Sequence, residues 1–115
     1  RFIVNFSSVS ARNGNVGQVD YTAAKGAIEA VTRTTAREFS NYRVRVNAIA
    51  PGPVNTPMLA GAGEQAVQAF KRATLLGKVA EPEDIAATVL GMACPKISGY
   101  TTGQIFAANG GLYLA

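Results

Sequence analysis

The first apolar run of the chain covers residues 2–6, which read FIVNF. The run is short and nearly continuous, which is typical of a strand buried on both faces of a parallel sheet. Residues 7–17 are rich in Ser, Asn and Gly, and they predict a loop. The chain therefore begins with a strand followed by a loop.

A helical period covers residues 21–40, and a strand-like alternation covers residues 43–50. Along the predicted helix, one stripe at i, i+4, i+7 and i+11 has the pattern of a side that faces a core; it consists of Ala24, Ile28, Val31 and Thr35. Along the predicted strand, the small and apolar set Val44, Val46, Ala48 and Ala50 alternates with the other residues until Pro51 and Gly52 stop it.

The remaining elements are set by proline and glycine. A loop follows Pro51, with a short helix expected over residues 64–72. A second long helix is predicted over residues 82–93, because Pro82 suits a first helical turn and Glu83 and Asp84 lie at the positive end of its dipole. Pro95 ends that helix, and a last strand over 104–108 meets a turn at 109–111.

The order is strand, helix, strand, short helix, helix, strand. Helices between successive strands predict an α/β fold with a parallel sheet and helices on both of its faces. Sites in such open sheets lie at the carboxyl ends of the strands. Three segments are expected there, starting at Ser7, Pro51 and Asn109.

Composition excludes several classes of function. The 115 residues include no His and one cysteine, Cys94, which excludes a His-dependent triad and a Cys-rich or His-rich metal site within the chain. No apolar run is long enough to span a membrane, and the low cysteine content fits a reducing cytoplasm, where we expect the protein to act. The net charge is +4, but no aromatic residues interleave with the arginines, so nucleic-acid binding is not expected; the arginines nearest to a cluster are Arg33, Arg37, Arg43 and Arg45.

Tyr21 and Lys25 are four residues apart in the predicted helix, so they share one face of it. An ammonium near a phenol favours the phenolate form and makes the tyrosine a capable general acid or base. The plain alternative is an ordinary pair on a helix surface. Spacing alone does not decide between them.

Two neighbouring segments favour the chemical interpretation. Ser7 and Ser8 stand at the end of the first strand, where a hydroxyl can reach the same substrate oxygen as Tyr21. The stretch APGPVNTP after the second strand can form a wall of backbone and the Thr56 hydroxyl beside a flat polar ligand. The alternatives are serines that satisfy loop backbone groups and a turn stiffened by prolines.

Four blocks of sequence resemble, in order and spacing, the C-terminal half of a short-chain dehydrogenase/reductase. They read NFSSVSARNGNVGQVDYTAAKGAIEAVTRTTAREF, RVNAIAPGPVNTPM, GKVAEPEDIA and TTGQIFAANGGLYL. Among subfamilies, the chain looks most like bacterial 3-oxoacyl-(acyl-carrier-protein) reductase. The resemblance implies the C-terminal half of a Rossmann-like doubly wound parallel sheet and hydride transfer between a nicotinamide cofactor and a carbonyl or alcohol.

The same resemblance implies a role for each matching residue. Tyr21 matches the general acid, Lys25 the lysine that assists it and holds the nicotinamide ribose, and Ser8, rather than Ser7, the serine that orients the substrate oxygen. The residues that match the nicotinamide site, in addition to Tyr21 and Lys25, are Pro51, Gly52, Val54 and Thr56, and residues 57–76 match a mobile substrate loop.

The chain departs from the family in lacking the glycine-rich TGxxxGxG loop and the residue that selects NAD or NADP. We therefore expect residues 1–115 to be the C-terminal catalytic part of a single Rossmann-like domain, with the N-terminal dinucleotide-binding half absent from this chain. The resemblance favours NADP over NAD. It also implies a small-molecule or acyl-carrier-bound carbonyl substrate.

Two hypotheses follow from this partial match. The chain is either a portion of an active reductase or a short product without catalysis that serves as an assembly partner or is an inactive remnant. The family usually forms homotetramers, and dimers also fit. Five alanines could pack closely against another subunit or, equally, within the chain: Ala23, Ala27, Ala30, Ala86 and Ala87.

Overall fold

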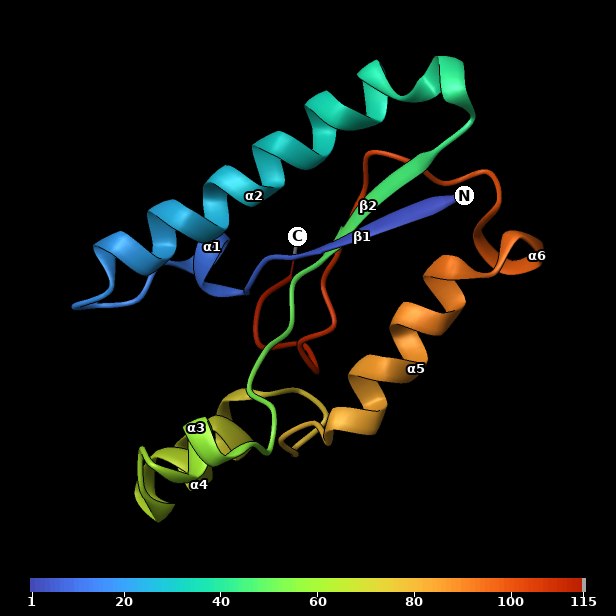
Figure 1. Ribbon diagram of the computed structural model, residues 1–115. Helices are drawn as coiled ribbons and strands as arrows, with labels where there is room; N and C mark the ends of the chain where they lie inside the picture. Colours follow the sequence, from blue (N-terminus) through green and yellow to red (C-terminus); the bar gives the residue numbers. More distant parts are fainter. Residues whose placement is uncertain (115) are drawn as a thin grey trace.

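The computed structural model describes residues 1–114 (Figure 1). The strands and the three longer helices predicted from the pattern are all present, and Pro82 begins its helix as expected. Three one-turn helices and one 3-10 turn were not predicted, because segments this short have no period to detect. The elements are β1 (Phe2–Phe6), α1 (Ser10–Asn13), α2 (Val19–Glu38), η1 (Ser40–Tyr42), β2 (Arg45–Ile49), α3 (Pro57–Ala60), α4 (Glu64–Ala73), α5 (Pro82–Ala93), α6 (Pro95–Ser98) and β3 (Ile105–Phe106).

The three strands form one parallel sheet in the order β1-β2-β3. Phe2 pairs with Arg45 and Phe6 with Ile49, so the carboxyl ends of β1 and β2 are level. Helices α2 and α5 lie on opposite sides of the sheet, and α3 and α4 lie together beyond the carboxyl ends of β1 and β2 (Figure 1). The predicted α/β class, with a Rossmann-like parallel sheet, is confirmed. Of the described residues, no helix is long and apolar enough to cross a membrane.

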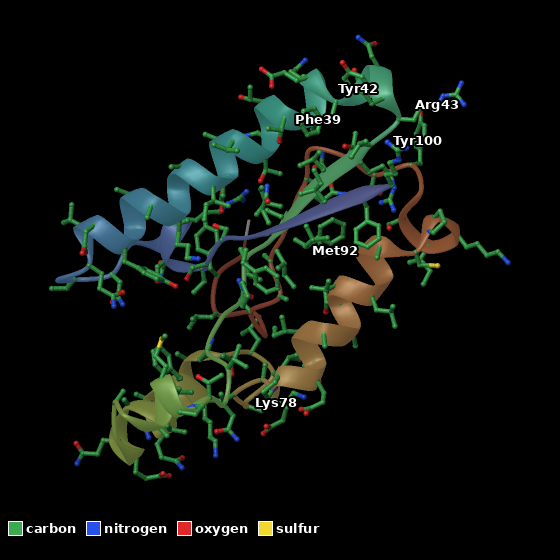
Figure 2. All side chains as sticks on the ribbon, viewed as in Figure 1. Phe39, Tyr42, Arg43, Lys78, Met92 and Tyr100 are labelled. Carbon is green, nitrogen blue, oxygen red and sulfur yellow. The ribbon has the colours of Figure 1, made fainter. Side chains whose placement is uncertain are left out.

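The face of the sheet toward α5 carries the hydrophobic core. Ile49 of β2 packs with Ile85 and Met92 of α5, and all three are buried. Met92 lies between α5 and the strands (Figure 2). Burial of a side chain of this size contributes about 2 to 3 kcal/mol. This apolar contact holds α5 on the sheet.

The guanidinium of Arg45 closes the far end of α5. It donates to the carbonyl oxygens of Met92 and Ser98 at 3.0 Å and of Ala93 at 2.9 Å. The carbonyls of Met92 and Ala93 belong to the last turn of α5 and have no backbone partner within that helix, and a cation there also offsets the negative end of the helix dipole. Arg45 is thus committed to the fold rather than to a basic surface patch.

The contact between the sheet and α2 is more polar. Its buried helix residues are Glu29, Thr32 and Ala36, and Asn5 of β1 donates to the Thr32 hydroxyl at 3.0 Å. The predicted stripe that contains Val31 is wrong as the core face, because Val31 is 53% exposed. The hydrogen bond from Asn5 turns the polar side of α2 toward the sheet, so Ala24 and Val31 of the stripe are exposed and Ile28 and Thr35 are half-buried.

Strand β1 does not have the double-sided burial that its composition predicts. Phe2 is 50% and Phe6 is 49% exposed, whereas Val46, Ala48 and Ile49 of β2 are fully buried. The cause is position: β1 is an edge strand and β2 is central. An apolar edge strand is a surface that commonly pairs with further polypeptide.

At the start of α5, the carboxylate of Asp84 has a backbone and a cationic partner. The backbone N–H of Glu81 donates to Asp84 Oδ2 at 2.8 Å, and Lys78 Nζ lies 3.5 Å from the same oxygen. The backbone hydrogen bond and then the Lys78 charge hold the pKa of Asp84 below its usual value. The position of Asp84 in the first turn agrees with the sequence expectation.

Candidate functional site

Ser8 lies where the ladder between β1 and β2 continues past the strand ends. The N–H of Ser7 donates to Ile49 O at 2.8 Å, and the N–H of Val9 donates to Pro51 O at 3.0 Å. These bonds hold Ser8 beside Pro51. Ser8 is buried, and its hydroxyl oxygen accepts a bond from the N–H of Ser10 at 3.2 Å. Within residues 1–114, no acceptor takes the hydrogen of that hydroxyl, which leaves it free for a ligand.

The hydroxyl of Ser7 has different partners. It lies 3.1 Å from Lys25 O and 3.2 Å from Glu29 Oε1, both on α2. One hydroxyl hydrogen serves one of these acceptors at a time, so Ser7 is occupied in binding β1 to α2. This difference supports the choice of Ser8 as the serine of the doublet that serves the site.

Tyr21 and Lys25 lie in the first two turns of α2. Tyr21 is 40% exposed, and the ammonium of Lys25 lies 5.8 Å from the centre of its ring. Lys25 Nζ also donates to Phe6 O at 3.0 Å. The ammonium is therefore fixed between the end of β1 and the phenol, with hydrogens left over for another partner.

Pro51 and Gly52 make the turn after β2. The N–H of Gly52 donates to Ala108 O at 3.0 Å, which joins this turn to the segment after β3. A Cβ atom at position 52 would lie 2.8 Å from the Cα of Asn109, so only glycine fits without a backbone shift. The three segments expected at the carboxyl ends of the strands do converge, with Asn109 packed behind Gly52.

Val54 and Thr56 follow on the same loop. Val54 forms an isolated bridge with Ala80, and the N–H of Asn55 donates to Ala80 O at 2.7 Å. The Thr56 hydroxyl accepts a weak bond from the N–H of Leu59 at 3.4 Å and so caps α3. The loop is therefore held at both ends, and the Thr56 hydroxyl keeps its hydrogen available.

All seven predicted site residues line one open hollow of about 730 Å³. Residues of α5 form an apolar wall of the same hollow. The sequence analysis did not predict this wall, because the sequence of a helix after a long loop does not indicate where the helix packs on the sheet. The lining includes Ser8, Tyr21, Lys25, Pro51, Gly52, Val54 and Thr56, together with Pro82, Ile85, Ala86 and Val89.

A second hollow of about 540 Å³ shares with the first every predicted site residue except Lys25. Its other walls come from the loop before α2 and from the segment around α3 and α4, and they include Asn13, Gln18, Leu59, Phe70 and Leu112. The hydroxyl groups of Ser8, Tyr21 and Thr56 thus stand where the two hollows meet. This arrangement can present one reactant from each side to a shared set of hydrogen-bond donors.

Residues 1–114 hold no group of three or more His, Cys, Asp or Glu side chains that could hold a metal ion. The site is instead composed of hydroxyls, one ammonium and backbone groups. Those groups suit proton donation and the stabilisation of negative charge on oxygen.

A fold of this kind, with a Tyr-x-x-x-Lys pair and a serine at the strand ends, is that of a short-chain dehydrogenase/reductase. The family model described as enoyl-(acyl carrier protein) reductase matches residues 2–113. The chain belongs to the short-chain dehydrogenase/reductase family. The resemblance stated from the sequence is thereby confirmed.

Individual relatives carry several activities in their names. The chain is 47% identical to the short-chain reductase protein NovJ of Streptomyces niveus, across 95% of this chain and 44% of NovJ. It is 40% identical to the 3-oxoacyl-[acyl-carrier-protein] reductase FabG of Aquifex aeolicus, across 96% of this chain and 44% of that protein. It is 39% identical to the NADPH-dependent aldehyde reductase 1 of Arabidopsis thaliana, across 95% of this chain and 38% of that protein.

Solved structures agree with the fold. A short-chain dehydrogenase/reductase of the glucose/ribitol dehydrogenase type from Brucella melitensis superposes with a TM-score of 0.93 at 31% identity, over 99% of this chain and 46% of that one. A 3-oxoacyl-[acyl-carrier protein] reductase from Brucella melitensis gives 0.92 at 35% identity, over 99% and 42%. The chain spans less than half the length of the relatives it matches.

Proposed function

We propose that the complete polypeptide that carries this chain is an NAD(P)-dependent oxidoreductase that interconverts a carbonyl compound and its alcohol. The observation that supports this most directly is the first hollow: all seven predicted residues line it, and all of them except Lys25 also line the second one. In this proposal, residues 1–115 are the C-terminal catalytic part of one Rossmann-like domain.

Three side chains of this chain carry the chemistry in the proposed reaction. Ser8 and Tyr21 donate hydrogen bonds to the carbonyl oxygen and stabilise its developing negative charge. As a hydride reaches the carbonyl carbon, Tyr21 transfers its Oη proton to the oxygen and the product alcohol forms. Lys25 stabilises the resulting phenolate, which regains a proton from solvent.

The first hollow suits a nicotinamide ring and its ribose. Pro51 and Gly52 supply a flat backbone wall, Val54 and Thr56 supply groups for a carboxamide, and Lys25 supplies spare hydrogens for ribose hydroxyls. The nicotinamide cofactor, when bound, supplies or accepts the hydride. NADP is the cofactor we favour over NAD, by family resemblance and by the name of one plant relative.

The second hollow is proposed as the substrate side. Its walls mix apolar side chains such as Leu59, Phe70 and Leu112 with the amides of Asn13 and Gln18. That lining fits a carbonyl compound with an apolar portion. An acyl chain on an acyl carrier protein, as in the FabG relatives, and a smaller aldehyde or ketone, as in the plant relative, are both candidates.

We further propose a homotetramer or dimer that acts in the cytoplasm. Four of the five alanines singled out in the sequence are exposed outside the first hollow, which Ala86 lines, and Val31 of α2 and Leu90 of α5 are exposed as well, so both helices offer small or apolar surface to another subunit. Contact through these helices would cover surface that is costly to leave in water.

One observation favours a second candidate function. The exposed Phe2 and Phe6 on the β1 edge suit a short, non-catalytic product that acts as an assembly partner. The intact mass of the native protein separates the two candidates. A native mass of 12.0 kDa, with no reductase activity, supports the assembly partner.

The reductase proposal is tested by replacing Tyr21 in the complete polypeptide. Carbonyl reduction with NADPH or NADH is measured across a panel of 3-oxoacyl thioesters, ketones and aldehydes. We expect Tyr21→Phe to lower kcat by about 100-fold to 10,000-fold, because the proton donor is lost, with the nicotinamide Kd changed little. Tyr42→Phe is the matched control, since Tyr42 lies at the opposite end of α2 (Figure 2). Unchanged turnover in Tyr21→Phe would remove the tyrosine from the mechanism.

A further inference from the structure

A buried carboxylate lies directly beneath the proposed site but lines neither hollow. Glu29 of α2 is 5% exposed. Its Oε1 accepts a hydrogen bond from the Ser7 hydroxyl at 3.2 Å, and its Oε2 accepts one from Arg12 Nε at 3.3 Å. A third cation, Arg33, approaches Oε2 at 3.9 Å. Carboxylates are almost never buried unless they are paired, and even a paired carboxylate is costly to bury. The burial of Glu29 therefore calls for an explanation.

The two close partners of Glu29 enclose Ser8 along the chain. Ser7 immediately precedes Ser8, and Arg12 lies in α1, whose first residue, Ser10, donates its N–H to the Ser8 hydroxyl. One side chain therefore holds the segment on both sides of the serine. Of the Ser8 hydroxyl, only the hydrogen has no partner within residues 1–114, so the direction in which it donates depends on how this segment is held.

The same carboxylate lies on the helix that carries the other two groups of the site. Glu29 comes one turn after Lys25 and two turns after Tyr21, on one face of α2. Lys25 adds a parallel tie, since its Nζ donates to Phe6 O at 3.0 Å. Residues 6–12 and α2 are thus joined through Phe6, Ser7 and Arg12, and Glu29 makes two of the three ties.

We propose that Glu29 is a positioning residue that sets Ser8 in register with Tyr21 and Lys25. The proposal rests on the function proposed above. The negative charge matters for two reasons. A charged acceptor binds the Arg12 guanidinium more strongly than a neutral one. It also competes for the single hydrogen of Ser7 against the carbonyl of Lys25, 3.1 Å from the same hydroxyl.

Glu29→Gln in the complete polypeptide removes the charge and keeps the shape. We expect kcat for carbonyl reduction to fall by about 10-fold to 100-fold, the range that a small misplacement of reacting groups causes. The Kd for nicotinamide should change much less than kcat, because four of the proposed cofactor contacts, Pro51, Gly52, Val54 and Thr56, belong to a separate segment. Glu38→Gln is the matched control, since Glu38 is an exposed glutamate of the same helix.

The Ser8→Ala background separates positioning from general stability. If Glu29 acts through Ser8, adding Glu29→Gln to Ser8→Ala lowers kcat by less than twofold more. An equal loss in both backgrounds would show a merely structural role and overturn the proposal. Should Glu29→Gln fold poorly, Arg12→Gln replaces it, because the Arg12 side chain is 33% exposed and tolerates change better.

Amide hydrogen exchange provides a readout that needs no activity. In Glu29→Gln we expect faster exchange at Ala11, Asn13 and Gly14, whose N–H groups donate to carbonyl oxygens of residues 8–10. We expect no change at Ala48 and Ala50 of the sheet. Unchanged exchange at Ala11, Asn13 and Gly14 would overturn the proposal even in an active enzyme. Absence of reductase activity in the wild-type protein, with the expected exchange, would instead overturn the proposed function alone.

Discussion

Helices α2 and α5 cover opposite faces of the same sheet, yet they are held by different forces. Helix α5 packs through Ile85 and Met92 onto Ile49, an apolar contact that has no preferred direction. Helix α2 buries Glu29 and Thr32 and is held by hydrogen bonds to β1. Hydrogen bonds fix register as well as distance, and the proposed proton-transfer groups lie on α2. We therefore infer that the contact with α2 positions the proposed site and that the apolar contact with α5 contributes more to stability.

Met92→Ala tests the apolar face and has the largest expected effect on stability. The side chain is buried between α5 and the sheet, so its removal leaves a cavity. We expect the free energy of unfolding of the complete polypeptide to fall by about 2 to 5 kcal/mol in urea titrations. Activity below the unfolding transition should change little. A loss under 1 kcal/mol would show that the contact with α5 is not the main core.

Thr32→Val tests the polar face with a side chain of nearly the same shape. It removes the acceptor of the Asn5 amide and the donor to Ile28 O. We expect a loss of about 1 to 2 kcal/mol, less than for Met92→Ala. We also expect a drop in kcat, because the tie between β1 and α2 loosens. Equal stability loss with unchanged kcat would contradict the division of roles between the two faces.

The smallest effect is expected at the start of α5. The lowered pKa of Asp84 means that this carboxyl group binds its proton less tightly in the folded protein than in the unfolded protein. Its contribution to stability is therefore present above the unfolded pKa of 3.8 and is lost as pH falls through the lower folded pKa. Asp84→Asn should flatten that part of the profile of unfolding free energy against pH. A profile with the wild-type slope in this range would show that the bonds of Asp84 to Glu81 and Lys78 contribute nothing to stability.

The strands and longer helices could be predicted because each has a strong local signal. Pro82 and the acidic first turn located α5 to the residue, and the apolar run located β1. Burial could not be predicted equally well. The exposure of Phe2 depends on β1 being an edge strand, and the burial of Glu29 depends on partners seventeen to twenty-two residues away in sequence. Neither fact is encoded in a local period.

The site shows the same division. Spacing placed Tyr21 and Lys25 on one helix face, and topology placed Ser8 and Pro51 at neighbouring strand ends. The tie between Lys25 and Phe6 O has no local signal, nor does the wall that α5 adds through Val89. The catalytic roles of Ser8, Tyr21 and Lys25 stay predictions, as do the binding roles of residues 51–56.

A double-mutant cycle tests most directly whether Ser8 and Tyr21 serve one oxygen. The rates of carbonyl reduction are measured for wild type, Ser8→Ala, Tyr21→Phe and the double variant of the complete polypeptide. Groups that act as a unit are strongly non-additive. We expect the double variant to be no more than a few-fold slower than the slower single variant. Losses that multiply in full would contradict a shared oxygen and, with it, the site proposed for this protein.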